Sequence, residues 1–169
     1  MKKPGKKVVF IIIAVIAAAA VGAAVWFYIR NRDERLIREN LDVLAGIAAK
    51  SANETAVMNA AKLSRPDKVF ASAVKVEAAE YGVNRTYSDK DCAKALAFLH
   101  RYYKSVEVSL DIHEIKVDGD KALVQASIRL RSTGGARPLP QLLKALLEYR
   151  KMEDKWRVTG VKILPLLQK

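Results

Sequence analysis

The sequence predicts an α+β protein in which one transmembrane helix precedes a domain of helices packed on a curved antiparallel sheet. Three observations support this fold class. Residues 8–29 form an apolar stretch without a charged side chain. Apolar residues then recur mainly at helical spacing up to residue 103, and from residue 104 they alternate with polar residues as in β-strands. Residues 30–169 are numerous enough for one domain.

The apolar stretch from Val8 to Ile29 has 22 residues, so a helix over it is about 33 Å long and crosses a hydrocarbon core of about 30 Å. Four lysines precede it, and an aromatic cluster at residues 26–28 closes it. These features predict an uncleaved signal anchor, with residues 1–7 as a basic tail and residues 30–169 as the following domain. A cleaved signal peptide is the alternative, but its apolar region usually has only about 7–15 residues.

Charge predicts the orientation and the partners. The chain has a net charge of +12, and beyond the first seven residues it keeps 26 basic against 18 acidic side chains. The short basic tail predicts a cytoplasmic amino terminus and a domain outside a bacterial inner membrane. Membrane lipid is the predicted partner of residues 8–29, and an envelope protein or a second copy is the predicted partner of the domain. Nucleic acid is not expected in that compartment.

The domain begins with helical patterns. Residues 33–50 place Ile37, Leu41 and Leu44 on one face, which predicts an amphipathic helix. Ser51 and Glu54 have the spacing of a capping box, so a second helix is predicted from there to residue 63. Residues 64–67 contain a proline that ends this helix and starts a short turn.

Residues 70–79 fit a strand, because Val74 and Val76 alternate with charged residues, or a helix, because the segment is rich in alanine. Residues 72–78 read as a strand and residues 81–84 as a turn. Ser88 and Asp91 cap another helix that runs to about residue 103. His100 lies off the apolar stripe of this helix and is predicted to be partly exposed. The stripe itself is predicted to be buried and consists of Cys92, Leu96, Leu99 and Tyr103.

From residue 104 the period is that of strands. Apolar residues alternate over 106–112 and resume at Ile115, one residue out of phase, which predicts a bulge near His113 and Glu114 that bends the strand. A hairpin turn at 118–120 leads to a second strand, and residues 132–140 form a loop.

Residues 140–152 fit a helix or a strand. A strand is preferred because the turn at 153–155 needs a partner for the final strand, Trp156 to Leu164.

The capped helix at Ser88, the hairpin over residues 116–122 and the ending over residues 148–158 together resemble a nuclear transport factor 2-like domain. Ketosteroid isomerase and scytalone dehydratase share this fold. The resemblance covers residues 33–164 and implies a cone-shaped sheet around a pocket. An amino-terminal span before such a domain also resembles an assembly subunit of type IV secretion channels, although this chain is shorter and no motif ties it there. The pocket that the resemblance implies has as lining candidates Phe70, Leu99, Tyr103, His113, Tyr149 and Trp156.

The sequence contains no convincing catalytic constellation. The isomerase Tyr–Asp pair and the dehydratase histidines have no match here, and the lone Cys92 cannot form an intramolecular disulfide or a cysteine zinc site. A His113–Glu114 acid–base pair is disfavoured because neighbouring strand residues point to opposite faces. We therefore predict no cofactor, no metal and a non-catalytic binding or scaffold domain. A ligand-binding protein or enzyme using the pocket, or a subunit of a secretion or envelope assembly, are the alternatives.

Overall fold

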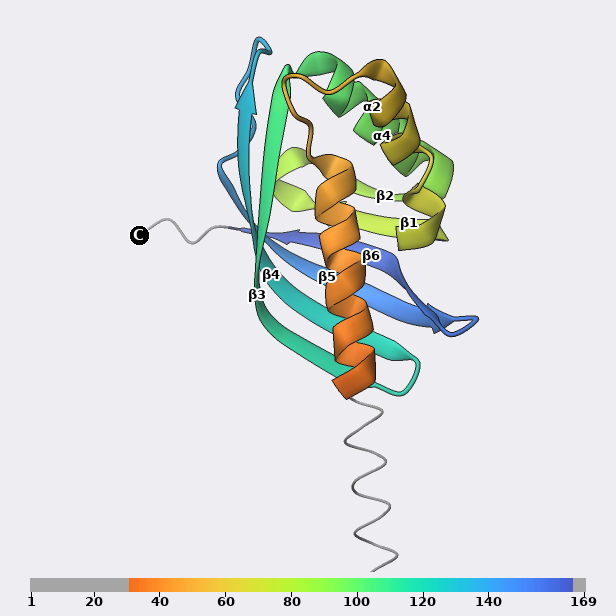
Figure 1. Cartoon of the computed structure of the whole chain (residues 1–169). Coiled ribbons are helices and arrows are strands. Elements are labelled where there is room, and N and C mark those ends of the chain that lie inside the picture. The colour runs from red at the N-terminus through yellow and green to blue at the C-terminus, as the bar shows by residue number, and fades with distance from the viewer. Residues whose placement is uncertain (1–30, 166–169) are drawn as a thin grey trace, which may run out of the picture.

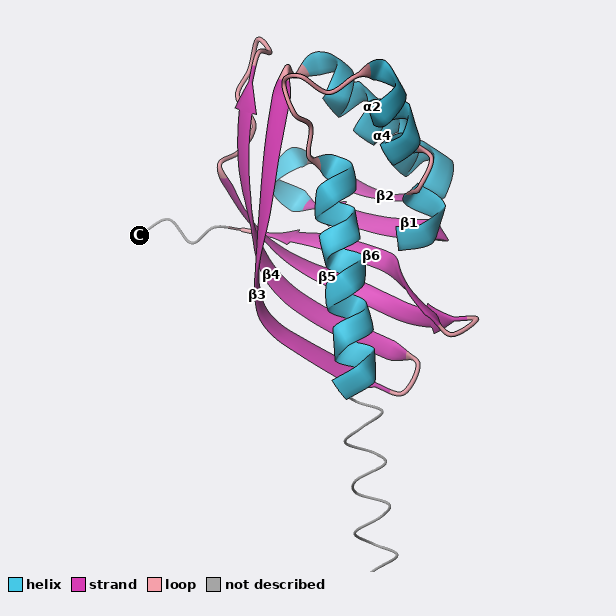
Figure 2. Ribbon diagram, in the orientation of Figure 1, coloured by secondary structure: helices cyan, strands magenta, loops and turns pink. Residues whose placement is uncertain are grey.

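Helices cover the concave face of a curved six-stranded sheet in the computed structural model, which describes residues 31–165 (Figure 1, Figure 2). The predicted tail and span, residues 1–29, lie outside these residues. Between residues 31 and 165, no helix is both long enough and apolar enough to cross a bilayer. The neighbouring strands across the sheet are, in order, β2 (Val83–Ser88), β1 (Phe70–Ala78), β6 (Lys155–Leu164), β5 (Leu142–Met152), β4 (Lys121–Thr133) and β3 (Ser105–Asp118).

The amphipathic helix predicted at 33–50 is a helix over residues 31–48 that crosses the concave face of the sheet (Figure 1). Ile37 and Leu41 are fully buried and Ile47 is nearly so, because the stripe predicted from helical spacing faces the sheet. Val43, which flanks the stripe, stays exposed to solvent.

The second helix begins later than its predicted capping box. α2 spans Ala56–Leu63, and its N-cap is Thr55, whose side chain accepts a hydrogen bond from the Met58 amide. Ser51 and Glu54 do interact, through the Ser51 N–H and a carboxylate oxygen at 3.1 Å, but they order the segment before the helix. The proline turn then becomes α3, Pro66–Val69, with the proline in its first turn.

β1 (Phe70–Ala78) confirms the strand predicted at 72–78. The following turn is a short 3-10 helix, η1 (Ala79–Tyr81), which ends at Gly82 in a left-handed conformation. It leads to β2 (Val83–Ser88), a strand that the sequence analysis missed, paired antiparallel with β1 at the edge of the sheet. Three of the six β2 residues are exposed and none is buried, so the strand has no apolar alternation.

The capped helix is confirmed as α4, Asp89–Tyr102, with a complete capping box between Ser88 and Asp91. Its predicted apolar stripe is at least partly buried. The prediction for His100 was wrong, because this residue is only 1% exposed. α2 and the residues before it pack over that side of α4. Helical spacing within α4 gives no information about such a contact with another segment.

Four long strands complete the sheet: β3 (Ser105–Asp118), β4 (Lys121–Thr133), β5 (Leu142–Met152) and β6 (Lys155–Leu164). They pair antiparallel in chain order, which confirms both predicted hairpins and the choice of a strand over residues 142–152. The sheet is nevertheless mixed and not wholly antiparallel as predicted, because β1 pairs parallel with β6. The chain crosses from β2 through α4 to the far edge of the sheet, and this connection sets the direction of β6.

The predicted bulge is present in β3. The register between β3 and β4 shifts between Ile112 and Glu114, so His113 is the extra residue. A second shift, between Glu148 and Tyr149, leaves Thr159 as an extra residue in β6. Bulges bend a strand and increase its twist, and both lie in the curved part of the sheet that holds the helix over residues 31–48.

Candidate functional site

The concave side of the sheet, where the resemblance implied a pocket, is occupied by side chains. Three of the predicted lining residues, Phe70, Tyr149 and Trp156, are no more than 8% exposed and belong to the main hydrophobic core. Ile37 and Leu41 of the helix over residues 31–48 belong to the same core. These residues therefore act in packing between the helix and the sheet.

A buried polar cluster fastens the start of this helix to the sheet. Asp33 is 4% exposed, and one of its carboxylate oxygens accepts a hydrogen bond from the Trp156 indole and from the Lys151 ammonium, both at 3.0 Å. Lys151 also lies 5.9 Å from the centre of the Trp156 ring. Both donors come from the last hairpin of the sheet, so this carboxylate holds the start of the helix in place.

The other three predicted lining residues lie elsewhere and do not converge. Tyr103 is buried outside the main core and donates its hydroxyl to the Arg137 carbonyl at 2.8 Å. Leu99 is half-buried on α4, and His113 is exposed on the bulge of β3. The structure therefore brings together three of the six predicted residues, and it does so in a packed core.

A second buried polar cluster joins α4 to the segment between the helix over residues 31–48 and α2. His100 contacts the side chain of Asn59 through Nδ1 and the Ala48 carbonyl through Nε2, at 3.1 Å for the latter. Lys50 donates to the carbonyls of His100 and Tyr103. Each contact bridges segments that are far apart in sequence, so the cluster serves to hold the fold.

Glu54 and Lys62 form an ion pair beside this cluster, with the Lys62 nitrogen 2.9 and 3.1 Å from the two carboxylate oxygens. Burial disfavours the charged carboxylate, but the bonds from Lys62 and the Ser51 amide outweigh it. Together they lower the pKa of Glu54 below its ordinary value.

Two further side chains with ionisable groups, Tyr149 and Cys92, are shielded by burial. The Tyr149 hydroxyl is buried, finds no hydrogen-bond partner within residues 31–165, and burial raises its pKa. Cys92 packs against the core, and burial, reinforced by Asp91 and Asp89, raises the pKa of its thiol. Both groups therefore stay protonated at neutral pH and are weak nucleophiles.

The outer face of the sheet holds a histidine–serine contact that the sequence analysis did not predict. His113 Nε2 lies 2.7 Å from Ser127 Oγ, the distance at which a histidine can act as a base toward a serine. The structure describes no carboxylate bonded to the other ring nitrogen, and Ser127 is only 7% exposed beneath the bulge. A substrate has little access to this hydroxyl, and the contact is best explained as a bond that secures the bulge.

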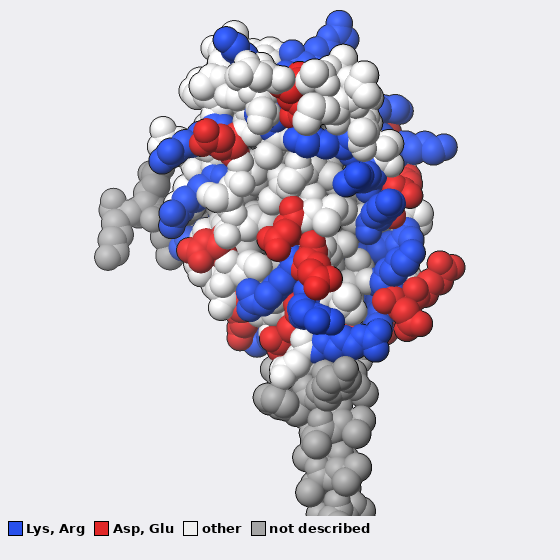
Figure 3. Space-filling view, viewed as in Figure 1, with Lys and Arg blue, Asp and Glu red and all other residues white. Residues whose placement is uncertain are grey.

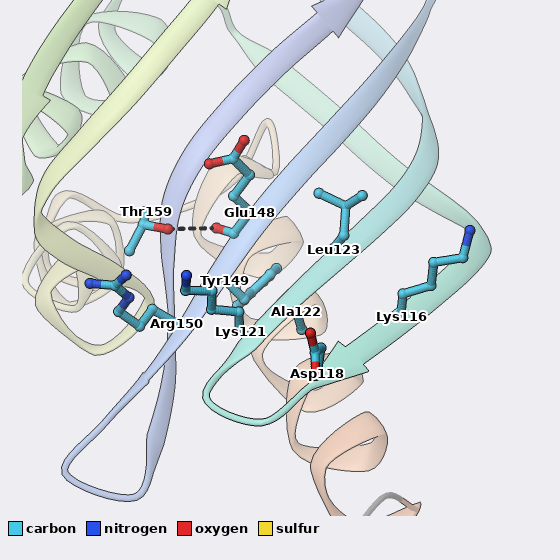
Figure 4. A pocket seen from close by; sticks show the side chains of 9 residues that line it. All are labelled: Lys116, Asp118, Lys121, Ala122, Leu123, Glu148, Tyr149, Arg150 and Thr159. Atoms are coloured by element: carbon cyan, nitrogen blue, oxygen red, sulfur yellow. Dashed lines mark hydrogen bonds between the residues drawn. The ribbon is translucent and has the colours of Figure 1, made fainter.

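The outer face also carries a hollow of about 560 Å³ across β3 to β6 (Figure 4). Leu123 is exposed in it, and Glu148 extends over Gly160, where any side chain would meet the carboxylate. Thr159, the extra residue of β6, donates its hydroxyl to the Glu148 carbonyl. The charged side chains around the hollow are Lys116, Asp118, Lys121, Glu148 and Arg150.

This outer hollow suits protein contact better than catalysis. It mixes both charge signs with exposed apolar surface, as the rims of protein interfaces do. No group of three or more His, Cys, Asp or Glu side chains in residues 31–165 is arranged to hold a metal. No two of its lining residues form a hydrogen-bonded pair of a nucleophile and a base.

The fold can now be compared with known proteins. No family model matches the sequence, and no curated protein matches it either. Solved structures do match. The Kfla4162 protein from Kribbella flavida has a TM-score of 0.64 at 19% identity, covering 82% of this chain and 94% of its own.

An NTF2-like protein from Cytophaga hutchinsonii has a TM-score of 0.53 at 9% identity, covering 81% of this chain and 98% of its own. The described domain has the nuclear transport factor 2-like fold. An NTF-2-like protein of unknown function from Silicibacter pomeroyi gives the same TM-score of 0.53 at 10% identity, covering 79% of this chain and 96% of its own. The TM-scores establish the fold. Identities this low leave the function to be argued from the residues.

Proposed function

We propose that this protein is a membrane-anchored, non-catalytic scaffold whose nuclear transport factor 2-like domain binds a partner protein outside the cytoplasm. The observation that carries the proposal is the packed concave face. In this fold a ligand or substrate would enter the cone, but here the helix over residues 31–48 and the sheet bury Ile37, Leu41, Tyr149 and Trp156 against one another.

The outer face of the sheet supports the binding part of the proposal. It carries the hollow around Leu123, and Leu142 on β5 is also exposed. A folded domain that places leucines on an open strand surface has area to contribute to an interface. Charged side chains of both signs surround them, which favours a specific partner over unselective sticking.

The proposed anchor is residues 8–29, for the reasons given by their length and flanks. The domain would be bound closely to it, because the helix over residues 31–48 begins almost at once and is fastened to the sheet by Asp33. A short connection of this kind raises the effective concentration of partners in the same membrane. Figure 3 shows acidic and basic side chains mixed at the end of the domain next to the anchor segment, so the visible face there has no patch of one charge sign for anionic lipid.

Complementation of a strain that lacks the protein tests the proposal. Ser127→Ala and His113→Ala, each at wild-type abundance, should restore function fully. Deleting residues 1–29 while exporting the domain to the same compartment should impair it. If the serine variant is folded but inactive, catalysis on the outer face replaces the scaffold proposal. If the untethered domain works normally, the anchor has no part in the function.

A further inference from the structure

Two arginines of β4 lie side by side on the outer face of the sheet. Arg129 and Arg131 are both exposed, while the residues between and beside them face the core side, as strand alternation requires. Two residues along a strand span about 6.7 Å, so the guanidinium groups can act together on one ligand.

The two arginines are almost free of partners. Within residues 31–165, Arg129 has one ion pair, with Asp111 at 3.9 Å between two largely exposed side chains, and such a contact holds the arginine weakly. Arg131 lies opposite Glu107 in the register but forms no ion pair with any residue that the structure describes. Both guanidinium groups therefore keep most of their donors for another molecule.

Hollows lie on both sides of the pair. On the β5 side, a hollow of about 560 Å³ combines the two arginines with an apolar wall of Leu139, Pro138 and Leu142. On the β3 side, a hollow of about 380 Å³ is lined by the same arginines and by residues 107–109. A segment lying along β4 would place acidic groups over the arginines and a neighbouring aliphatic side chain against the leucines.

The apolar wall is held in place before any partner arrives. The loop between β4 and β5 is fastened by the Tyr103 hydroxyl to the Arg137 carbonyl, by the Leu139 amide to the Ser132 hydroxyl, and by the Leu130 amide to the Gln141 carbonyl. A surface that is ordered in advance loses less entropy on binding.

Gly135 lets the loop lie close to the aromatic rings at the carboxyl-terminal end of α4, Tyr102 and Tyr103. Its φ is +122°, and a Cβ there would come within 2.8 Å of the Tyr103 ring. A glycine is therefore needed for this approach.

We propose that Arg129, Arg131 and the loop over residues 134–141 dock an acidic, extended segment of a partner protein that carries an aliphatic residue beside its carboxylates. The proposal rests on the scaffold function and names the chemistry of its partner. Alternate residues of an extended segment are spaced like the two arginines, so carboxylates two residues apart match them. The β4–β5 loop lies at the end of the domain opposite residue 31 (Figure 1), which favours a protein over the lipid of the anchoring membrane.

A peptide with glutamates two residues apart and a leucine two residues beyond each, Leu-Ser-Glu-Ser-Glu-Ser-Leu, is a suitable probe. Its fluorescein-labelled form would be titrated with the full chain in an uncharged detergent at low salt, with fluorescence anisotropy as the readout. We expect saturable binding that weakens about tenfold in Arg129→Gln/Arg131→Gln, as for two exposed charge pairs. The glutamine version of the peptide should not bind.

The matched control is Lys116→Gln/Lys121→Gln, which removes the same charge from the same face of the sheet, at the hollow of Figure 4. It should change the affinity less than twofold. An equal loss in both double variants would show attraction to net charge alone and overturn the proposal, as would absence of binding at about 1 mM protein. Because the scaffold function is tested by complementation, a failure here with an intact need for the anchor removes only this docking site.

Discussion

At the scale of single residues, Trp156 combines core packing with a buried hydrogen bond. Its ring packs in the core and its indole nitrogen bonds Asp33, so one side chain joins the last hairpin to the start of the helix over residues 31–48. Replacing a buried tryptophan by alanine costs about 3–5 kcal/mol. That is a large part of the 5–15 kcal/mol that holds a typical domain together.

We expect Trp156→Ala to lower the unfolding free energy of residues 30–169 by about 3–5 kcal/mol, measured by urea denaturation. Trp156→Phe is the matched control, because it keeps an aromatic ring but removes the bond to Asp33. It should lose about 1–3 kcal/mol, the cost of a buried acceptor left without one donor together with some lost packing. An unchanged midpoint for the alanine variant would mean that the residue is not in the core.

Removing the hydroxyl of Tyr149 should not destabilise the domain, in contrast to the Trp156 substitutions. Its hydroxyl is buried without a partner among the described residues, so removing it relieves a desolvation cost. Tyr149→Phe is expected to leave the unfolding free energy unchanged or to raise it by up to about 1 kcal/mol. A loss above 1 kcal/mol in the same urea assay would indicate that the hydroxyl is hydrogen-bonded in solution.

The residues that the sequence analysis missed share one property. Asp33, Ser127 and His100 obtain their roles from partners 14 to 123 positions away, and no local pattern encodes such pairs. Asp33 reads in the sequence as one more charge near the start of an amphipathic helix. Trp156 could be placed in the last strand from its neighbours, but its polar partner could not be named.

At the scale of elements, periodicity predicted those with one apolar face. The helix over residues 31–48, α4 and the strands β3, β4 and β6 bury alternate or helically spaced residues, so their type could be predicted. β5 fitted either period, and its type was predicted from the turn that joins it to the final strand. β2 lies at a sheet edge and buries none of its six residues, so it was missed. The bulge at His113 was foreseen because a change of phase is a local signal, whereas the parallel pairing of β1 with β6 depends on the path of the whole chain.

The bulge offers a test of how the sheet is bent. Deleting His113 would bring the two halves of β3 into one phase, so the apolar residues of 106–112 and the buried Ile115 would all face the core from a regular strand without the bulge. We expect this deletion variant to keep its strands, as judged by circular dichroism, but to be less stable than His113→Ala in urea denaturation, because a less bent β3 fits the helix over residues 31–48 less well. His113→Ala keeps the extra residue and loses only the bond to Ser127, so it should fold and lose about 0.5–1.5 kcal/mol. Equal stability of the deletion variant and His113→Ala would mean that the bulge does not bend the sheet into the shape that the core needs.

α2 buries no residue fully, and its attachment depends partly on the Glu54–Lys62 ion pair. Since the pKa of Glu54 is lowered in the folded state, its stabilising effect is complete above the ordinary carboxyl pKa of 4.5 and is lost as pH falls through the lower folded-state value. Glu54→Gln should therefore be less stable than wild type at pH 7, by about 0.5–1 kcal/mol for a pair open to solvent on one side. Thermal unfolding from pH 7 to pH 3 should show the two proteins converge. A constant difference would mean that the ionised carboxylate does not provide the stabilisation.

At the scale of the whole molecule, the helix over residues 31–48 packs into the concave side of the sheet, where the resemblance implied a pocket. Residues 31–48 occupy the concave face and leave the convex face of the sheet as the open surface. Of the charged side chains in residues 31–165, 24 are basic and 18 acidic, so the excess over this part is six. The proposed binding surface is therefore the outside of the sheet, and the proposed anchor would decide which partners can reach it.

The last prediction concerns that anchor. Because residues 8–29 are long enough to span the hydrocarbon core and end in a bulky aromatic cluster, the protein should remain in the membrane pellet after carbonate extraction and keep its full mass. A soluble product that begins near residue 24 would identify a cleaved signal peptide instead. A reporter that is active only outside the cytoplasm, fused after Lys169, should be active, since four lysines precede the span and favour a cytoplasmic amino terminus. Activity of a cytoplasm-specific reporter at the same position would reverse the orientation, and the proposed partner would then have to lie inside the cell.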